Sequence, residues 1–199
     1  FWDQCGSTWT LQAEKMNRTL FGVEIMSSQV QAINGPLILA FVPLCQYVIY
    51  PLLNRVWPLT PLRKIGLGIF LIGVSFLVSA WIDVMLGSGA RPSILWQAPA
   101  YVLLSLGEVM ASITALEFAY TQAPKHLKAV VQALYLFSVS LGNFFTAGVQ
   151  WFIGNADGTS KLSGPAYFVF YALLAMGAAG VFALVAKNYR GKSQLQTET

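Results

Sequence analysis

The chain has 199 residues, of which 56% are hydrophobic and only 10% are charged. Soluble domains carry about a quarter charged residues, so this composition excludes an ordinary water-soluble globule. The net charge is +4, but the basic residues lie in short connectors between apolar stretches, which argues against nucleic acid as a partner and for anchoring beside a lipid bilayer.

The chain begins at Phe1, without a basic segment followed by a signal-cleavage site. We expect it to be a fragment of a longer protein. Its opening stretch is then the end of a membrane-spanning helix that starts upstream.

Long stretches with few or no ionisable side chains follow, each able to supply the roughly 20 apolar residues of a helical crossing. Helices are expected because lipid cannot satisfy open backbone groups, and the alternation typical of barrel strands is absent. The sequence predicts an all-α membrane protein with a polar tail. The expected spans are 1–12 (partial), 29–53, 65–84, 94–119, 129–153 and 165–186, with the tail at 187–199.

The connectors predict the orientation of these spans. Cytoplasmic connectors are enriched in Lys and Arg, so the side with more of them, including the tail, should be cytoplasmic. Eight basic residues lie on that side (Arg55, Arg63, Lys64, Lys125, Lys128, Lys187, Arg190, Lys192) and four on the other (Lys15, Arg18, Arg91, Lys161).

The span at 29–53 contains Pro36, Pro43 and Pro51, and each proline removes a backbone donor and bends a helix. Prolines are also simply tolerated in membrane helices, and we favour this interpretation for Pro43 and Pro51. Asn34, just before Gly35 and Pro36, is a neutral amide at the expected break. It either contacts a substrate or satisfies backbone groups that the proline frees, and the sequence favours neither.

The last span contains Ala175, Ala179 and Ala183 at four-residue spacing. Small residues at this spacing let helices approach closely. We therefore expect these alanines to pack against another helix.

Glu108 lies near the middle of the span at 94–119. A carboxylate there is costly unless it is protonated, paired or exposed to a water-filled cavity. Such a group suits a proton-coupled carrier and can bind a cationic part of a substrate; the alternative is a structural partner for a buried Arg or Lys elsewhere. Intramembrane acids favour the functional interpretation.

Two further acids have other surroundings. Glu117 lies nine residues after Glu108, on the opposite face of a regular helix, and we expect it to form a stabilising or gating ion pair with Lys125 or Lys128. Asp3 lies in the partial span. If the span continues upstream, the argument for Glu108 applies to Asp3; otherwise Asp3 belongs to an exposed terminus.

Asp83 and His126 fall at span ends and are expected to be interface residues. His126, Cys5 and Cys45 have no partners at metal-ligand spacing, and no nucleophile motif, phosphate-binding loop or zinc-protease motif is present. The sequence therefore predicts neither an enzyme nor a bound cofactor or metal.

Three stretches occur in order, with apolar spans between them. The first is Asp3-Gln-Cys-Gly-Ser-Thr-Trp-Thr-Leu-Gln-Ala, the second is Ile33-Asn-Gly-Pro, and the third combines Leu106-Gly-Glu-Val with Leu116-Glu-Phe-Ala-Tyr-Thr-Gln-Ala-Pro. They are similar to segments of the seventh, eighth and tenth helices of the proton-dependent oligopeptide transporters. The resemblance covers essentially the whole chain.

The resemblance implies the major facilitator fold, which has twelve helices in two halves. This chain would be the six-helix C-terminal bundle, helices seven to twelve, with the seventh truncated. It also implies symport of di- and tripeptides with protons by alternating access, driven by the proton gradient without a cofactor. The implied partners are the peptide, protons, the bilayer and the N-terminal half, in the plasma membrane of what looks like a bacterium.

By resemblance, Glu108 is the acid that meets the peptide's amino terminus and Asn34 is a pocket amide. Asp3 is linked to extracellular gating and proton coupling. Tyr135 falls where many members carry a pocket Trp, and this change weakens the assignment of Tyr135 and of Ser138 to the substrate pocket.

The chain departs from the family pattern in three places. The seventh-helix Trp of the family precedes the acid by four residues and so lies outside this chain. The ExxER motif belongs to the other half, and the Arg-rich loop of many facilitators is weak at 53–58. Two rival functions stay open: the same fold carrying another solute, such as nitrate or an amino acid derivative, and a non-transporting nutrient sensor or scaffold.

Overall fold

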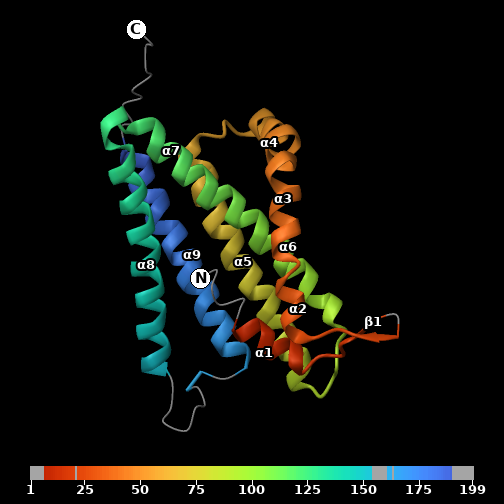
Figure 1. Cartoon of the computed structure of the whole chain (residues 1–199). Helices are drawn as coiled ribbons and strands as arrows, with labels where there is room; N and C mark the ends of the chain where they lie inside the picture. Colours follow the sequence, from red (N-terminus) through yellow and green to blue (C-terminus); the bar gives the residue numbers. More distant parts are fainter. Residues whose placement is uncertain (1–6, 21, 154–160, 163, 190–199) are drawn as a thin grey trace.

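The computed structural model describes residues 7–20, 22–153, 161–162 and 164–189. Five long helical segments in this part of the chain run alongside one another, with connectors at both ends of the bundle (Figure 1). Each is long and apolar enough to cross a membrane. They are Ser27–Val56, Pro61–Gly87, Ile94–Gln122, Lys128–Ile153 and Pro165–Asn188.

The ends of these segments lie no more than four residues from the predicted bounds; the largest difference is Pro61 against the predicted 65. Helix α1 (Thr8–Glu14) is the described part of the expected partial span. The remainder of that stretch, including Asp3, lies outside the described residues.

The first long segment is broken twice. It consists of α2 (Ser27–Gln31), α3 (Asn34–Leu44), a π-helical turn (Cys45–Ile49) and α4 (Tyr50–Val56). Pro36 lies in the first turn of α3 and Pro51 at the start of α4, where a missing donor costs little. Two of the three prolines therefore coincide with breaks, whereas Pro43 lies inside α3.

The third long segment is also irregular. A 3-10 turn (Ile94–Gln97) leads into α6 (Ala98–Glu108), a π-helical turn (Val109–Ile113) and α7 (Thr114–Gln122). A π turn has i→i+5 hydrogen bonds and rotates the chain less per residue than an α-helix. The count that placed Glu117 opposite Glu108 assumed a regular helix, so that expectation does not hold.

Helix α5 (Pro61–Gly87) lies between α6 and α9 (Pro165–Asn188) and packs against both. Glycines permit the close approach: a Cβ on Gly73 would lie 2.9 Å from Cγ of Met176 on α9. The predicted packing role is confirmed for Ala175 and Ala179, which are buried. Ala183 is exposed.

An aromatic core joins α1, α5, α6 and α9. Trp9, Phe76, Tyr101 and Tyr171 are fully buried, and the Trp9 ring meets Tyr101 edge-on at a centroid distance of 4.9 Å. Edge-to-face and offset pairs of this kind add to the stabilisation from area burial. Short α1 is therefore anchored by its tryptophan.

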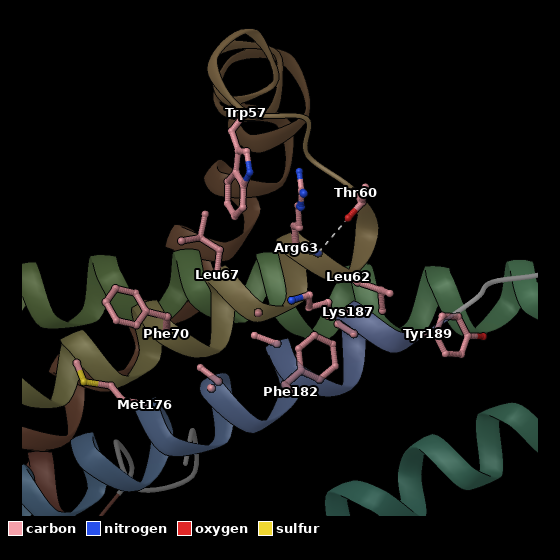
Figure 2. A pocket seen from close by; sticks show the side chains of 15 residues that line it. Trp57, Thr60, Leu62, Arg63, Leu67, Phe70, Met176, Phe182, Lys187 and Tyr189 are labelled. Atoms are coloured by element: carbon pink, nitrogen blue, oxygen red, sulfur yellow. Dashed lines mark hydrogen bonds between the residues drawn. The ribbon is translucent and has the colours of Figure 1, made fainter.

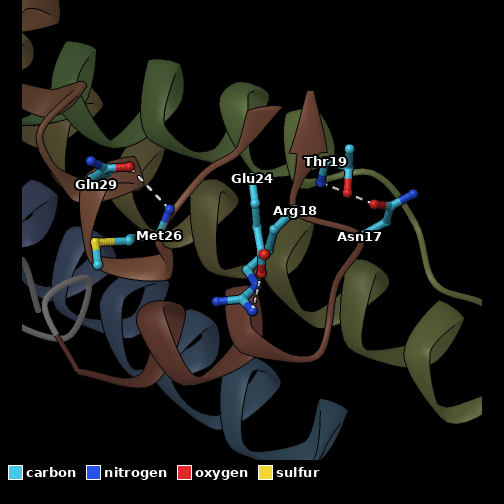
Figure 3. Close-up of polar contacts among 6 residues, drawn as sticks. All are labelled: Asn17, Arg18, Thr19, Glu24, Met26 and Gln29. Carbon is cyan, nitrogen blue, oxygen red and sulfur yellow. Dashed lines mark hydrogen bonds and ion pairs between the residues drawn. The ribbon is translucent and has the colours of Figure 1, made fainter. Parts of the chain in front are cut away.

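A β-hairpin, absent from the sequence prediction, follows α1. Strands β1 (Thr19–Leu20) and β2 (Val23–Glu24) pair antiparallel, and Gly22 adopts φ +81° in the turn. The Arg18 guanidinium binds the Glu24 carboxylate at 2.7 Å, and the Asn17 side chain accepts a hydrogen bond from the Thr19 amide at 3.0 Å (Figure 3). The ion pair joins the two sides of the hairpin at its base, and the Asn17 bond shapes the entry to β1.

Helix α8 (Lys128–Ile153) stands at the edge of the bundle, next to α7 (Figure 1). Most of its large apolar side chains are exposed, including Phe144 at 80% and Trp151 at 85%. Lipid, or another part of the protein, must cover this helix.

Candidate functional site

Glu108 and Asn34 meet in the membrane-spanning part of the bundle. The Asn34 amide nitrogen donates to the Glu108 carboxylate at 3.4 Å, and the Ser105 hydroxyl donates to the Asn34 carbonyl oxygen. Asn34 is 5% exposed and Ser105 is fully buried, whereas Glu108 is half-buried. This polar cluster, Asn34–Ser105–Glu108, links α3 to α6 and leaves the carboxylate partly accessible.

Local sequence fixes both ends of the cluster. Asn34 is the first residue of α3, immediately after the break that follows α2. Its two side-chain hydrogen bonds go to Glu108 and Ser105 of α6, not to backbone groups that the proline frees. Direct contact of Asn34 with a substrate stays a prediction.

Glu108 is held by a close helix crossing. A Cβ on its neighbour Gly107 would lie 2.7 Å from the Gly68 carbonyl oxygen, and a Cβ on Gly68 would lie 2.6 Å from the Gly107 carbonyl oxygen. Only glycine fits at both positions, so α6 rests directly on α5 one residue before the acid. The π turn begins one residue after it, and π turns frequently occur at functional sites.

Tyr135 and Ser138 lie on α8. Ser138 is exposed and its hydroxyl donates to the Tyr135 carbonyl oxygen at 2.7 Å, while Tyr135 is half-buried. These two residues therefore form a second group, and the structure does not join them to the polar cluster on α3 and α6.

Glu117 lies on α7 and is exposed. Within the described side chains it forms no ion pair with Lys128, so that part of the prediction is wrong; the Lys125 side chain lies outside them. The Lys64 ammonium of α5 lies 3.9 Å from the centre of the Tyr50 ring of α4, at the end of the bundle where α4 and α7 lie in Figure 1.

A second buried polar network, which the sequence analysis missed, lies near the opposite end. The Gln12 amide donates to the Ser79 carbonyl oxygen at 2.9 Å and to Asp83 Oδ1 at 3.2 Å, and Gln97 donates to the Gln12 oxygen at 3.1 Å. Asp83 lies near the end of α5, as predicted, but it is only 9% exposed and is buried among helices. The partners are 71 and 85 residues from Gln12, and no local pattern pairs them.

Among the described residues, no group of three or more His, Cys, Asp or Glu side chains is arranged to hold a metal ion. Cys45 is buried and forms no disulfide within the described part of the chain, which agrees with its expected role as a packing thiol.

The apolar helices, the buried polar clusters within them and the exposed outer faces define a multi-pass α-helical membrane protein. A sequence model of the POT family matches residues 1–168, and the chain belongs to this family. The predicted resemblance and the predicted all-α major facilitator fold are confirmed.

Several relatives are named as peptide transporters. The chain is 32% identical over 160 residues to the peptide transporter PTR2 of Saccharomyces cerevisiae, which covers 72% of this chain and 26% of that protein. It is 41% identical over 98 residues to peptide transporter 3 of Caenorhabditis elegans, covering 49% of this chain and 13% of the relative. The chain thus spans about a quarter or less of these proteins.

Solved structures share the fold. A crystal structure described as an auto-inhibited POT family peptide transporter matches with a TM-score of 0.89 and 34% identity, over 98% of this chain and 39% of that one. The in meso structure of the POT family transporter PepTSo matches with a TM-score of 0.84 and 37% identity, over 94% of this chain and 38% of that one.

Proposed function

We propose that the chain is the C-terminal bundle of a symporter that carries di- and tripeptides together with protons by alternating access. One observation carries the proposal: in a member of the POT family, a half-buried carboxylate lies mid-helix and is held by an amide from a neighbouring helix. The names of the relatives support peptides as the cargo.

The chemistry of the polar cluster suits a peptide with a free amino terminus. In this proposal the Glu108 carboxylate pairs with the peptide ammonium while Asn34 orients the carboxylate. A charge-assisted hydrogen bond of this kind is stronger than a neutral one. When the peptide is absent, the same carboxylate can accept a proton instead. The peptide and the proton therefore compete for Glu108, and this competition couples their transport.

The remaining predicted residues receive the roles expected from the sequence. Tyr135 and Ser138 on α8 contact the peptide from another side, Asp3 takes part in proton coupling, and Glu117 on α7 takes part in gating. The protein resides in the plasma membrane with residues 187–199 in the cytoplasm, and the proton gradient drives uptake against the opposing N-terminal half.

The full-length protein in proteoliposomes tests this proposal, with an inward proton gradient and a labelled dipeptide. Glu108→Gln should reduce uptake roughly tenfold or more, because the amide cannot pair with an ammonium. Glu14→Gln removes an exposed carboxylate at the end of α1 and should leave uptake unchanged.

Each alternative function has its own outcome. Uptake of nitrate or an amino acid derivative without peptide uptake would show that this solute, and not a peptide, is the substrate. Peptide binding without flux would indicate a sensor. Normal peptide uptake by Glu108→Gln would refute the assignment of Glu108.

A further inference from the structure

A groove of about 810 Å³ lies between the connector after α4, the first turns of α5 and the last turns of α9 (Figure 2). Its wall on α5 runs from Arg63 through Leu67 to Phe70, a distance of about 10 Å along the helix. The wall on α9 runs from Lys187 back to Met176, about 16 Å. The groove is therefore elongated along the helices.

One end of the groove is cationic and the rest is apolar. Arg63 and Lys187 are exposed at the connector end, whereas Leu67, Phe70 and Phe182 line its length. Neither cation forms an ion pair with a carboxylate that the structure describes. Arg63 stacks on Trp57 at 4.7 Å and donates to the Pro58 carbonyl oxygen at 2.6 Å; a guanidinium has five donors, so others remain for a ligand.

The groove belongs to the part of the bundle that carries none of the predicted transport residues. Asn34, Glu108 and Tyr135 lie on α3, α6 and α8, while the groove lies on α5 and α9. Phe70, at 45% exposure, opens toward the surroundings of the bundle. In the inference that follows, those surroundings are acyl chains.

We infer that this groove binds one anionic glycerophospholipid, with the phosphate at Arg63 and Lys187 and one acyl chain between α5 and α9. Basic pockets between transmembrane helices on the cytoplasmic side attract anionic head groups. The segment 190–199 contains two basic residues and one acid, so it does not complement the two cations.

Native mass spectrometry of the delipidated full-length protein tests the inference, by titration with dioleoyl phosphatidylglycerol and with dioleoyl phosphatidylcholine. The wild type should bind one phosphatidylglycerol roughly 30-fold more tightly than phosphatidylcholine, as expected for two cations near the membrane surface. Arg63→Gln/Lys187→Gln should abolish this preference. Lys187→Gln alone should reduce the preference for phosphatidylglycerol about fivefold. Because Lys187 is exposed, this single variant replaces the double variant if the latter fails to fold.

A matched control removes the same charge from the same end of the bundle. Arg55 and Lys128 lie outside the groove, and Arg55→Gln/Lys128→Gln should retain the preference; an equal loss in this control would mean diffuse attraction and overturn the inference. Gly180 lines the groove, and a Cβ there meets nothing within 4 Å. Gly180→Leu keeps both cations but should weaken phosphatidylglycerol binding by filling the groove.

Two further results would overturn the lipid assignment. One is a Gly180→Leu variant that binds phosphatidylglycerol as the wild type does. The other is competition by free glycerol phosphate at the lipid's own concentration, because the ligand would then be a soluble phosphate.

Discussion

Glu108 illustrates how a single residue acquires a defined environment from positions far away in the chain. Its amide partner is 74 residues earlier, on a helix that begins at that partner. The hydroxyl of Ser105, one turn before Glu108, fixes the amide's orientation. The carboxylate thus accepts a hydrogen bond from Asn34 and is still partly accessible.

The Asn34 amide can be removed by substitution to test its role. Asn34→Leu removes one donor from Glu108 and the acceptor of the buried Ser105 hydroxyl, and a buried polar group that loses its partner costs about 1–3 kcal/mol. We expect kcat/KM for dipeptide uptake to fall roughly tenfold in proteoliposomes, with a smaller loss in Ser105→Ala, which removes only one bond. Unchanged kinetics in Asn34→Leu would show that the cluster does not prepare the carboxylate for its substrate.

The sequence predicted Glu108 and Asn34 as site residues because each is a polar side chain inside a membrane span, where burying a polar group costs free energy. It did not predict that the two meet. It also missed Gln12 and Asp83, which looked like residues near span ends and are instead buried against each other. Pairings over such separations follow from the arrangement of helices, which hydropathy alone does not specify.

Helix pairing depends on a few glycines. Gly107→Ala would place a Cβ 2.7 Å from the Gly68 carbonyl oxygen, a backbone atom that cannot move aside without shifting α5. Such overpacking costs about 1–3 kcal/mol, so we expect a lower melting temperature in detergent together with reduced uptake, since Glu108 moves with its neighbour.

Gly177→Ala is the matched control, because a Cβ at Gly177 on α9 meets nothing within 4 Å. Alanine favours a helix over glycine, so this variant should be at least as stable as the wild type. Equal melting temperatures for Gly107→Ala and Gly177→Ala would contradict the tight crossing.

The locations of the long helices followed from gaps between charged residues, and this is why their bounds lie close to the predicted ones. The internal breaks were harder. Pro36 marked the first break, whereas Pro51, which was expected to be tolerated, lies at the start of α4 directly after the second break. The π turn after Glu108 contains Val, Met, Ala, Ser and Ile, and none of these signals a change of helix type. The hairpin rests on Gly22 and the Arg18–Glu24 pair, which resembled an ordinary polar connector.

The connectors at one end of the helix bundle carry more Lys and Arg than those at the other, which predicts that the richer end is cytoplasmic. Ser88 and His126 are exposed in connectors at opposite ends. In a background without Cys5 and Cys45, a membrane-impermeant maleimide should label Ser88→Cys in intact cells. It should label His126→Cys only after permeabilisation, and the reverse pattern would place the tail outside.

The π turns within the long segments have a consequence for comparing this chain with its relatives. A π turn takes up one residue more than an α-helix over the same stretch, so every helical-wheel position beyond Ile113 shifts by about 100°. A relative that lacks the turn requires a one-residue alignment gap near Val109. Without that gap, the positions equivalent to Glu117 and Tyr120 would be assigned to their neighbours, and conserved faces of the helix would be misread.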